Sequence, residues 1–469
     1  MNKQEATQRC LAILAVLVSC GMGVLVGAEA EKKTIPGPLP RRIVKAWRDA
    51  GAEVGWMKDL PPQRAGGYRF WEPWHEQAET GDIPAFRFPG RNAKLGKLPD
   101  PGTVFGLDFH CGFYPGASLT ELAALKSLRS LNLGGTRLTD EELMELAALR
   151  QLQALYLFYT SVTDAGLKVL AGLKDLRVLD LSNTRVSVAG LKELAGLKGL
   201  QALNLHHTRT TDAGLKELAG LTRLQQLALC QTKVTSAGMK ALGGLKELRA
   251  LDLGGTEVAD PGLKELAGLT GLQQLNLSDT KVTDAGLKQL AGLKGLTVLD
   301  LSGTRVTSEG LKELTGLTNL TTLDLSGTPV TDAGLKGFVG LKKLGVLRLN
   351  QTKVTDAGLK ELGGLKGLTT LELSKTSVTD AGLRELAGLE KLAEFELRGA
   401  RVTDTGLKHL AGLKNLASLD LSDTLVTDAG LKELAGLRRL VVLVLNRTKV
   451  TAKGEAELAR VLPKCRIWR

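Results

Sequence analysis

The eleven residues Thr211–Leu221 read TDAGLKELAGL, and the same eleven letters return at Thr427–Leu437. The two copies start 216 residues apart, which is nine times 24. Near-copies such as TDAGLKVLAGL from Thr163 and TDAGLKQLAGL from Thr283 fall on the same period. A catalytic motif is normally written once, whereas a structural unit is written many times. The period therefore decides the fold class, because it predicts a chain built from stacked copies of one short unit.

One such unit, Leu152–Asp175, contains a strand signal followed by a helix signal. The segment LYL places Leu155 and Leu157 on one face of an extended chain. The segment DAGLKVLAGL then spaces leucines three residues apart, as on one face of a short helix. Asp164 occupies the place of a helix N-cap, and Gly172 the place where a left-handed residue usually ends a helix. One unit cannot bury its apolar face alone, so neighbouring units must stack.

The first strand leucine predicts the number of units. It recurs every 24 residues from Leu107 to Leu443, with Phe395 once in its place, which gives 15 strands. Ile467 falls one step later and is expected to start a closing strand.

The resulting pattern, LxxLxLxxT…GLxxLxxL, covers about 360 residues and resembles the leucine-rich repeat. Thr stands where that family usually has Asn, from Thr136 to Thr448, and fails only at Ala400. The unit length is similar to the ribonuclease-inhibitor-like repeats, and the near-identical copies resemble bacterial exported members. The resemblance implies an α/β fold. It would be a right-handed solenoid shaped like a horseshoe, with a parallel β-sheet on the concave face and short helices on the convex face.

Residues 1–30 have the features of a secretory signal. Lys3 and Arg9 precede 19 residues without a charge, and Ala28–Ala30 read AEA at the expected cleavage site. The segment LVSC ending at Cys20 also resembles a bacterial lipobox, in which Cys20 would be lipidated. The apolar run is also long enough for an uncleaved anchor. All three alternatives predict an exported chain, whether secreted, periplasmic or at the cell surface.

Residues 31–103 differ from the repeats and hold four of the five Trp residues. We expect a helix from Pro40 and a strand around Val54, and we interpret the region as a cap on the first repeat. A small ligand-binding module is the alternative. Residues 104–450 are the predicted solenoid of about 15 units, and residues 451–469 are the predicted C-terminal cap.

The sequence lacks the motifs of common catalytic and metal sites, including CxxC, HExxH, GxSxG and Gly-rich phosphate loops. His75 with Glu72 and Glu76 is the one cluster in the N-terminal region with acid–base potential. His206 and Cys230 share a column in adjacent units, but a closed zinc site needs four ligands. The sequence therefore predicts a non-catalytic protein with no cofactor and no metal.

The three cysteines beyond the signal are Cys111, Cys230 and Cys465. Neighbouring strands lie about 4.8 Å apart, and at least five strand steps separate any two of these residues. A disulfide requires Cα atoms within about 7 Å, so no internal disulfide is expected.

The residue between the two strand leucines faces the concave side of such a solenoid. We call this set the concave column, and 8 of its 15 members are acidic. It consists of Asp108, Asn132, Tyr156, Asp180, Asn204, Ala228, Asp252, Asn276, Asp300, Asp324, Arg348, Glu372, Glu396, Asp420 and Val444. Like charges on adjacent strands cost stability. The column therefore favours a basic partner, unless it is simply a solvated polar face.

A second column runs along the helices from Lys168 to Lys432 and is basic throughout. Asp212 precedes Lys216 by four residues, and the same spacing recurs in most units. Such pairs stabilise a helix by a few tenths of a kcal/mol, and we interpret the column in this way. Contact with an anionic surface such as a membrane or cell-wall polymer is the alternative. Nucleic acid is not an expected partner, because aromatic and basic residues are not interleaved.

Departures from the consensus define the candidate binding site. Most units place small or polar residues after the strand, but aromatic and His residues stand there in nearby units. They predict a patch on the concave surface about 15 Å across, and aromatic residues dominate interface hot spots. The candidate partner-binding residues are Tyr156, Phe158, Tyr159, Asp180, Asn183, Asn204, His206, His207 and Gln231.

We predict non-catalytic recognition of a protein partner through the concave face. The alternative is an adhesive or structural component of the cell envelope that binds glycans or cell-wall polymers. A glycan binder would depend on the aromatic patch, and a protein binder on the longer acidic column. Membrane contact is expected only through an N-terminal anchor or lipid.

Overall fold

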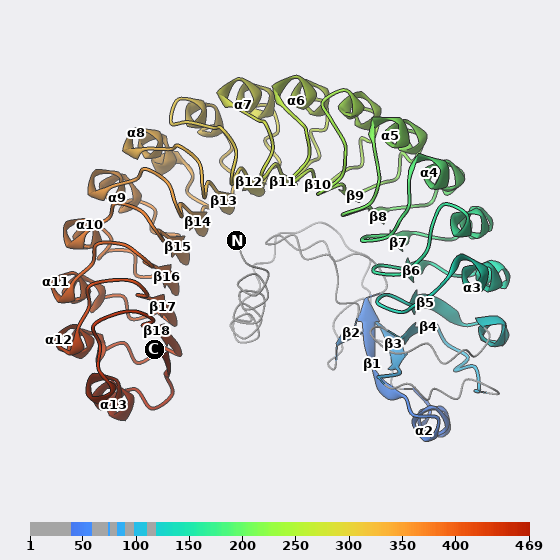
Figure 1. Ribbon diagram of the computed structural model, residues 1–469, viewed down its shortest axis with the longest axis horizontal. Helices are drawn as coiled ribbons and strands as arrows, with labels where there is room; N and C mark the ends of the chain where they lie inside the picture. Colours follow the sequence, from blue (N-terminus) through green and yellow to red (C-terminus); the bar gives the residue numbers. More distant parts are fainter. Residues whose placement is uncertain (1–38, 59–73, 76–81, 90–97, 110–118) are drawn as a thin grey trace.

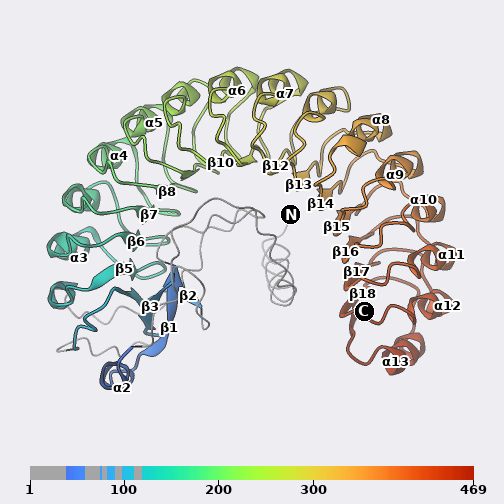
Figure 2. The ribbon, with the colours of Figure 1, turned by 180° about the vertical axis from the view of Figure 1, so that it is seen from behind.

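The computed structural model describes residues 39–58, 74–75, 82–89, 98–109 and 119–469. Among these residues the strands form one 19-stranded sheet. The sheet lines the inner side of an open arc, and the helices lie on the outer side (Figures 1 and 2). This is the solenoid that the repeat period predicts, with the sheet on the concave face.

The repeating strands are short and pair in parallel with a constant register. Leu155 lies opposite Leu179, and every later pair is offset by the same 24 residues, so the predicted strand register is confirmed. The strands are β1 Glu53–Lys58, β2 Trp74–His75, β3 Asp82–Arg87, β4 Phe105–Asp108, β5 Leu128–Asn132, β6 Ala154–Tyr156, β7 Val178–Asp180, β8 Ala202–Asn204, β9 Gln226–Ala228, β10 Ala250–Asp252, β11 Gln274–Asn276, β12 Val298–Asp300, β13 Thr322–Asp324, β14 Val346–Arg348, β15 Thr370–Glu372, β16 Glu394–Glu396, β17 Ser418–Asp420, β18 Val442–Val444 and β19 Arg466–Trp468.

The outer helices are short, and a unit contains an α-helix, a 3-10 helix or one followed by the other. The α-helices are α2 Arg41–Asp49, α3 Asp140–Met144, α4 Val188–Leu194, α5 Asp212–Leu218, α6 Asp260–Leu266, α7 Asp284–Leu290, α8 Asp332–Leu335, α9 Asp356–Leu362, α10 Asp380–Glu385, α11 Asp404–Leu407, α12 Asp428–Leu431 and α13 Ala452–Val461. The 3-10 helices are η1 Leu119–Ala124, η2 Glu145–Ala148, η3 Gly166–Gly172, η4 Gly238–Leu242, η5 Gly310–Leu314, η6 Lys336–Gly340, η7 Lys408–Leu410 and η8 Lys432–Leu434.

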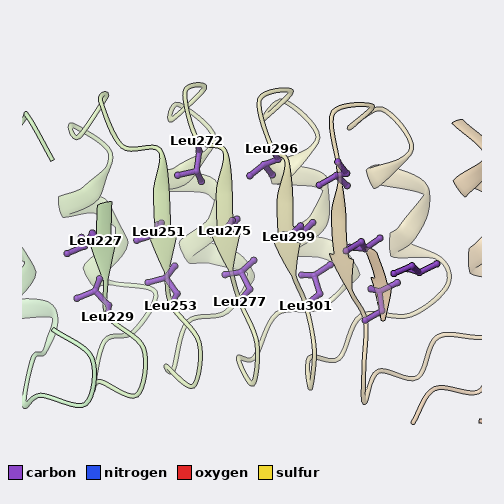
Figure 3. Packing of buried hydrophobic residues seen from close by; sticks show 14 of the residues in the cluster. Leu227, Leu229, Leu251, Leu253, Leu272, Leu275, Leu277, Leu296, Leu299 and Leu301 are labelled. Carbon is purple, nitrogen blue, oxygen red and sulfur yellow. The ribbon is translucent and has the colours of Figure 1, made fainter. Parts of the chain in front are cut away.

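The core is a continuous layer of leucines between the sheet and the helices. Leu275 and Leu277 of one unit pack beside their equivalents Leu251 and Leu253 of the previous unit, and all four are fully buried (Figure 3). The recurring Thr closes each coil, because its hydroxyl donates to the leucine carbonyl three residues earlier, as in Thr280 to Leu277 at 2.6 Å. Each unit therefore shares its apolar interior with its neighbours.

The Asp of the repeated TDAG segment links neighbouring units. Asp164 is not a helix N-cap as predicted, because its carboxylate accepts hydrogen bonds from Ser187 N at 2.6 Å and Ser187 Oγ at 2.5 Å. Asp260 bonds Thr283 in the same way, at 2.8 and 2.7 Å. The N-cap is the preceding Thr, and Thr283 Oγ1 accepts from Ala285 N. The carboxylate thus fixes the start of the next unit's helix.

The Gly of the same segment makes room for that carboxylate. A Cβ atom at Gly286 would lie 2.4 Å from Oδ1 of Asp260 in the previous unit. The TDAG segment therefore recurs because each residue type has a structural role. Thr caps the helix, Asp hydrogen-bonds to the next unit, and Gly leaves space for the Asp carboxylate of the previous unit.

Two other sequence expectations about the helices are wrong. Asp212 bonds Thr235, and the described residues contain no ion pair between Asp212 and Lys216. The left-handed backbone expected at Gly172 occurs instead in the turn after the strand, as at Gly255 with φ of 64°. Lys216 therefore lacks the local ion pair assigned to it, whereas Lys312 pairs with Glu309 of the same unit at 2.6 Å. No C-cap of the described repeat helices has a positive φ.

The N-terminal residues extend the sheet past the first repeat. Helix α2 and strand β1 are the helix and strand expected near Pro40 and Val54. Strand β3 pairs in parallel with β4 and antiparallel with β1. At the other end β19 pairs in parallel with β18, which confirms the closing strand at Ile467.

Several predictions fall outside the described residues. The signal segment 1–30, with Cys20, is one, and Cys111, Glu72 and Glu76 are others. Only the backbone of His75 is described, in β2. Cys230 and Cys465 are both free thiols. None of the described helices combines the length and the apolar character that crossing a membrane requires.

Candidate functional site

The concave column is covered in its first half and reaches solvent in its second half. Tyr156, Asp180 and Asn204 are 3%, 4% and 2% exposed. From Asp300 onward the column residues are at least partly exposed. The part of the inner face that a partner can reach is therefore the part formed by the later strands.

The first strands cover the early part of the column. Met57 of β1 and Ile83 of β3 belong to a second hydrophobic cluster, which also contains Ala154, Tyr156 and Val178. Tyr156 is thus a core residue that joins the N-terminal strands to the repeats. Its assignment to the partner-binding patch is wrong, because its ring is buried.

Asp180 and Asn204 are also buried in structural contacts. Asn204 Nδ2 donates to Asp180 Oδ2 at 3.0 Å, and Asp180 accepts from Ser182 N at 2.9 Å. Burial raises the pKa of the Asp180 carboxyl above its usual range. These two side chains join adjacent strands by a hydrogen bond. Because both are buried, the prediction that they contact a partner is wrong.

The remaining patch residues gather at the turn that follows strands β6 to β9. The ring centroids of Phe158 and Tyr159 lie 6.4 Å apart, and those of His206 and His207 lie 5.8 Å apart. Tyr159 is 65% exposed. Gln231 is exposed as well, whereas Asn183 is partly buried. These residues lie at the lateral corner of the arc, where the concave face ends.

Four of these corner residues share a left-handed backbone. The φ angles are 53° at Tyr159, 55° at Asn183, 54° at His207 and 56° at Gln231. Some other units place Gly at this position, as at Gly255, and others a polar residue with the same backbone, as at Asp279 and Gln351. A bulky side chain here carries a conformational cost that glycine avoids.

His206 and Cys230 contact each other, with His206 Nδ1 and Cys230 Sγ 2.6 Å apart. Burial and the adjacent Asp252 raise the pKa of the Cys230 thiol. Burial and the nearby His207 lower the pKa of His206. Both shifts favour the neutral forms of the two side chains. Across the described part of the chain, no group of three or more His, Cys, Asp or Glu residues is arranged to hold a metal ion.

The accessible part of the concave column is strongly acidic, and we call its six residues on β12 to β17 the acidic surface. Arg348 lies among the carboxylates, with its Nε 2.7 Å from Glu372 Oε1 and its Nη1 4.0 Å from Asp324 Oδ2. The sequence places these residues in one column, but it does not show which carboxylates Arg348 contacts. The members are Asp300, Asp324, Arg348, Glu372, Glu396 and Asp420.

Crowding raises the proton affinity of this surface. Burial, together with Asp324, raises the pKa of Asp300 to about 6. Glu396 is exposed, but partial desolvation by its neighbours, together with Glu372 and Asp420, raises its pKa to about 7. Both carboxyls therefore change charge near neutral pH, well above the usual values of 3.8 and 4.5.

These shifts predict a pH-dependent stability. A carboxyl whose pKa is raised by folding stabilises the fold most below its unfolded pKa, and this contribution is lost as pH rises through the folded value. We expect the melting temperature to fall as pH rises from about 5 to about 8 through the pKa values of Asp300 and Glu396. The variant Asp300→Asn/Glu396→Gln should flatten this decline in thermal melts across that range. The exposed Glu390→Gln should leave it unchanged, and an equal flattening by both variants would refute the assignment.

Comparisons with known proteins agree with this architecture. One leucine-rich repeat family matches residues 150–209 and 270–330, and a second matches residues 124–147, 246–267, 368–387 and 412–435. No curated protein matches the sequence.

Solved structures with the same fold include two bacterial proteins. An internalin from Listeria monocytogenes is 24% identical, with a TM-score of 0.56 over 76% of this chain and 95% of that one. A leucine-rich repeat protein from Leptospira interrogans is 25% identical, with a TM-score of 0.53 over 74% of this chain and 91% of that one.

The chain is a leucine-rich repeat protein. Proteins of this class are commonly scaffolds for protein–protein recognition and are typically non-catalytic. The assignment to the ribonuclease-inhibitor-like subtype stays a prediction from the 24-residue period.

Proposed function

We propose that this protein recognises a partner protein through the acidic surface and that the partner contributes a basic, extended segment. One observation carries the proposal: five carboxylates on adjacent strands reach solvent around a single guanidinium, that of Arg348. The later strands form the part of the concave face that the first strands leave open.

Electrostatic repulsion on the acidic surface is relieved by a cationic partner. Neighbouring strands hold these side chains about 4.8 Å apart, and like charges at that spacing destabilise the fold. Arg348 compensates mainly Glu372 and Asp324. Lysine or arginine side chains from a partner would compensate the others, which explains how a locally unfavourable arrangement can serve recognition.

The acidic surface ends in apolar residues. Val444 follows Asp420 in the column, and Trp468 lies opposite Val444 on β19. Trp468 is 58% exposed. An exposed Trp beside a charged track supplies the kind of anchor that dominates many interfaces. The bound segment would therefore combine several basic residues with an apolar residue at the end nearest β19.

We infer from residues 1–30 that the chain is exported. Cleavage after Ala30, lipidation of Cys20 and a retained anchor are the three forms that export could take. Cell fractionation with and without globomycin separates them, because only a lipidated Cys20 would make processing sensitive to that inhibitor. The division into a cap of residues 31–103, a solenoid of residues 104–450 and a C-terminal cap of residues 451–469 is part of the same proposal.

The recognition proposal predicts that neutralising the acidic surface weakens binding of a cationic peptide. A fluorescent octalysine peptide should bind the full chain, and Asp324→Asn/Glu372→Gln/Glu396→Gln/Asp420→Asn should weaken this binding by about tenfold or more. Fluorescence anisotropy at two salt concentrations measures the effect.

A matched control variant removes four carboxylates that lie outside the acidic surface. Glu141, Glu247, Glu265 and Glu385 are exposed residues outside the concave column. Their replacement by Gln changes the net charge equally and should leave peptide binding within about twofold. Equal weakening by both variants would show that only net charge matters, and it would refute the site.

A further inference from the structure

The lateral corner after strands β7 to β9 carries three adjacent cations. Arg185, Arg209 and Lys233 occupy the same position in three consecutive units, one residue after the buried Thr. All three are exposed, and none makes an ion pair with a described residue. They form a row of positive charge beside the corner residues described above.

The backbone fixes the spacing of this row. Arg185 N donates to Val162 O at 3.3 Å, Arg209 N to Val186 O at 3.0 Å, and Lys233 N to Thr210 O at 3.0 Å. Each bond joins one unit to the previous unit, so the three residues advance by one strand spacing, about 4.8 Å, at a time. The row therefore presents regularly spaced charges along a line.

Two exposed rings lie near the cations. His207 precedes Arg209 by two residues, and Tyr159 occupies the equivalent position two units earlier, with Asn183 in the unit between them. Tyr159 adopts a left-handed φ of 53° although its ring is 65% exposed. The fold gains little burial from a Tyr at this place, and Gly would adopt the same backbone without cost.

We propose that this corner binds a linear anionic polysaccharide with one carboxylate per sugar. The carboxylates would pair with Arg185, Arg209 and Lys233, while the rings of Tyr159 and His207 stack on the apolar faces of the sugars. Evenly spaced charges with two exposed rings nearby match a polymer that repeats the same group, whereas a protein segment offers mixed side chains.

The polysaccharide site and the acidic surface have opposite charge and lie on different parts of the unit. One class of ligand cannot satisfy both sites, so the two proposals stand or fall separately. Together they would allow the chain to hold an anionic polymer and a basic protein segment at once.

The test uses oligogalacturonate as the probe and a neutral dextran oligomer as the reference. Arg185→Gln/Arg209→Gln/Lys233→Gln should weaken oligogalacturonate binding by about tenfold in calorimetry. The control Lys216→Gln/Lys264→Gln/Lys288→Gln removes the same charge from exposed helix positions and should have little effect. Equal weakening by both triple variants would overturn the proposal, because binding would follow net charge alone.

A second variant separates ligand contact from folding. Tyr159→Gly removes the ring and places at this position the residue found at Gly255, whose φ is 64°. It should therefore weaken oligogalacturonate binding severalfold while leaving thermal stability equal or higher. Undiminished binding by this variant, or binding to anionic phosphatidylglycerol vesicles without binding to oligogalacturonate, would overturn the proposal. Octalysine binding should stay unchanged in these variants, which distinguishes this site from the acidic surface.

Discussion

Replacing Trp47 with Ala is expected to lower the free energy of unfolding by about 3–5 kcal/mol. Trp47 in α2 is fully buried and stacks on Phe86 of β3, with ring centroids 4.2 Å apart. Its ring also meets Phe105 of β4 edge-on at 5.8 Å, and its Nε1 donates to Pro99 O at 3.0 Å. The substitution would leave a large cavity and an unpaired carbonyl where α2, β3 and β4 join.

Trp468→Ala provides the matched control for this prediction, because Trp468 is 58% exposed on the last strand. Its loss should change stability by no more than about 0.5 kcal/mol. Urea denaturation followed by far-UV circular dichroism compares the two variants without depending on tryptophan emission. A loss below about 1 kcal/mol for Trp47→Ala would mean that the N-terminal strands contribute little to the stability of the repeats.

The repeat period made the sheet predictable. Once Leu155 and Leu179 are recognised as equivalents, parallel stacking leaves only one register, and the structure has that register. The strand count, the concave column and the closing strand at Ile467 follow from the same spacing. The roles of Asp and Gly in the TDAG segment were less visible, because the contacts run between units. Ser236 offers a clue, since its Oγ replaces the Asp carboxylate and accepts from Ala259 N at 2.9 Å.

The covering of the early concave column could not be derived from the period. It depends on Met57 and Ile83, which lie outside the repeats. The row two residues before the column gives no clear signal, because Ala154 and Val178 are apolar but so are Val298 and Val346 on the later, open strands. The exposed candidate residues therefore lie on the later strands and at the lateral corner, and Tyr156 is not among them.

Gly286→Ala is expected to destabilise the solenoid by about 1–3 kcal/mol, although alanine is the better helix former. The new Cβ would lie 2.4 Å from Oδ1 of Asp260 and 3.0 Å from Cδ1 of Leu263. The carboxylate would have to move, which breaks its bonds to N and Oγ1 of Thr283 at 2.8 and 2.7 Å. Urea denaturation of the full chain measures the loss.

A double-mutant cycle with Asp260→Ala tests the mechanism, because that change removes the carboxylate before the methyl group is added. Gly286→Ala should then cost much less, and the difference is the coupling between the two units. Gly292→Ala lies in the same unit with no neighbouring atom within 4 Å of its Cβ, so it should be neutral or slightly stabilising. If Gly286→Ala and Gly292→Ala behaved alike, the Gly would serve only the helix, and the Asp link would not explain why the segment is repeated.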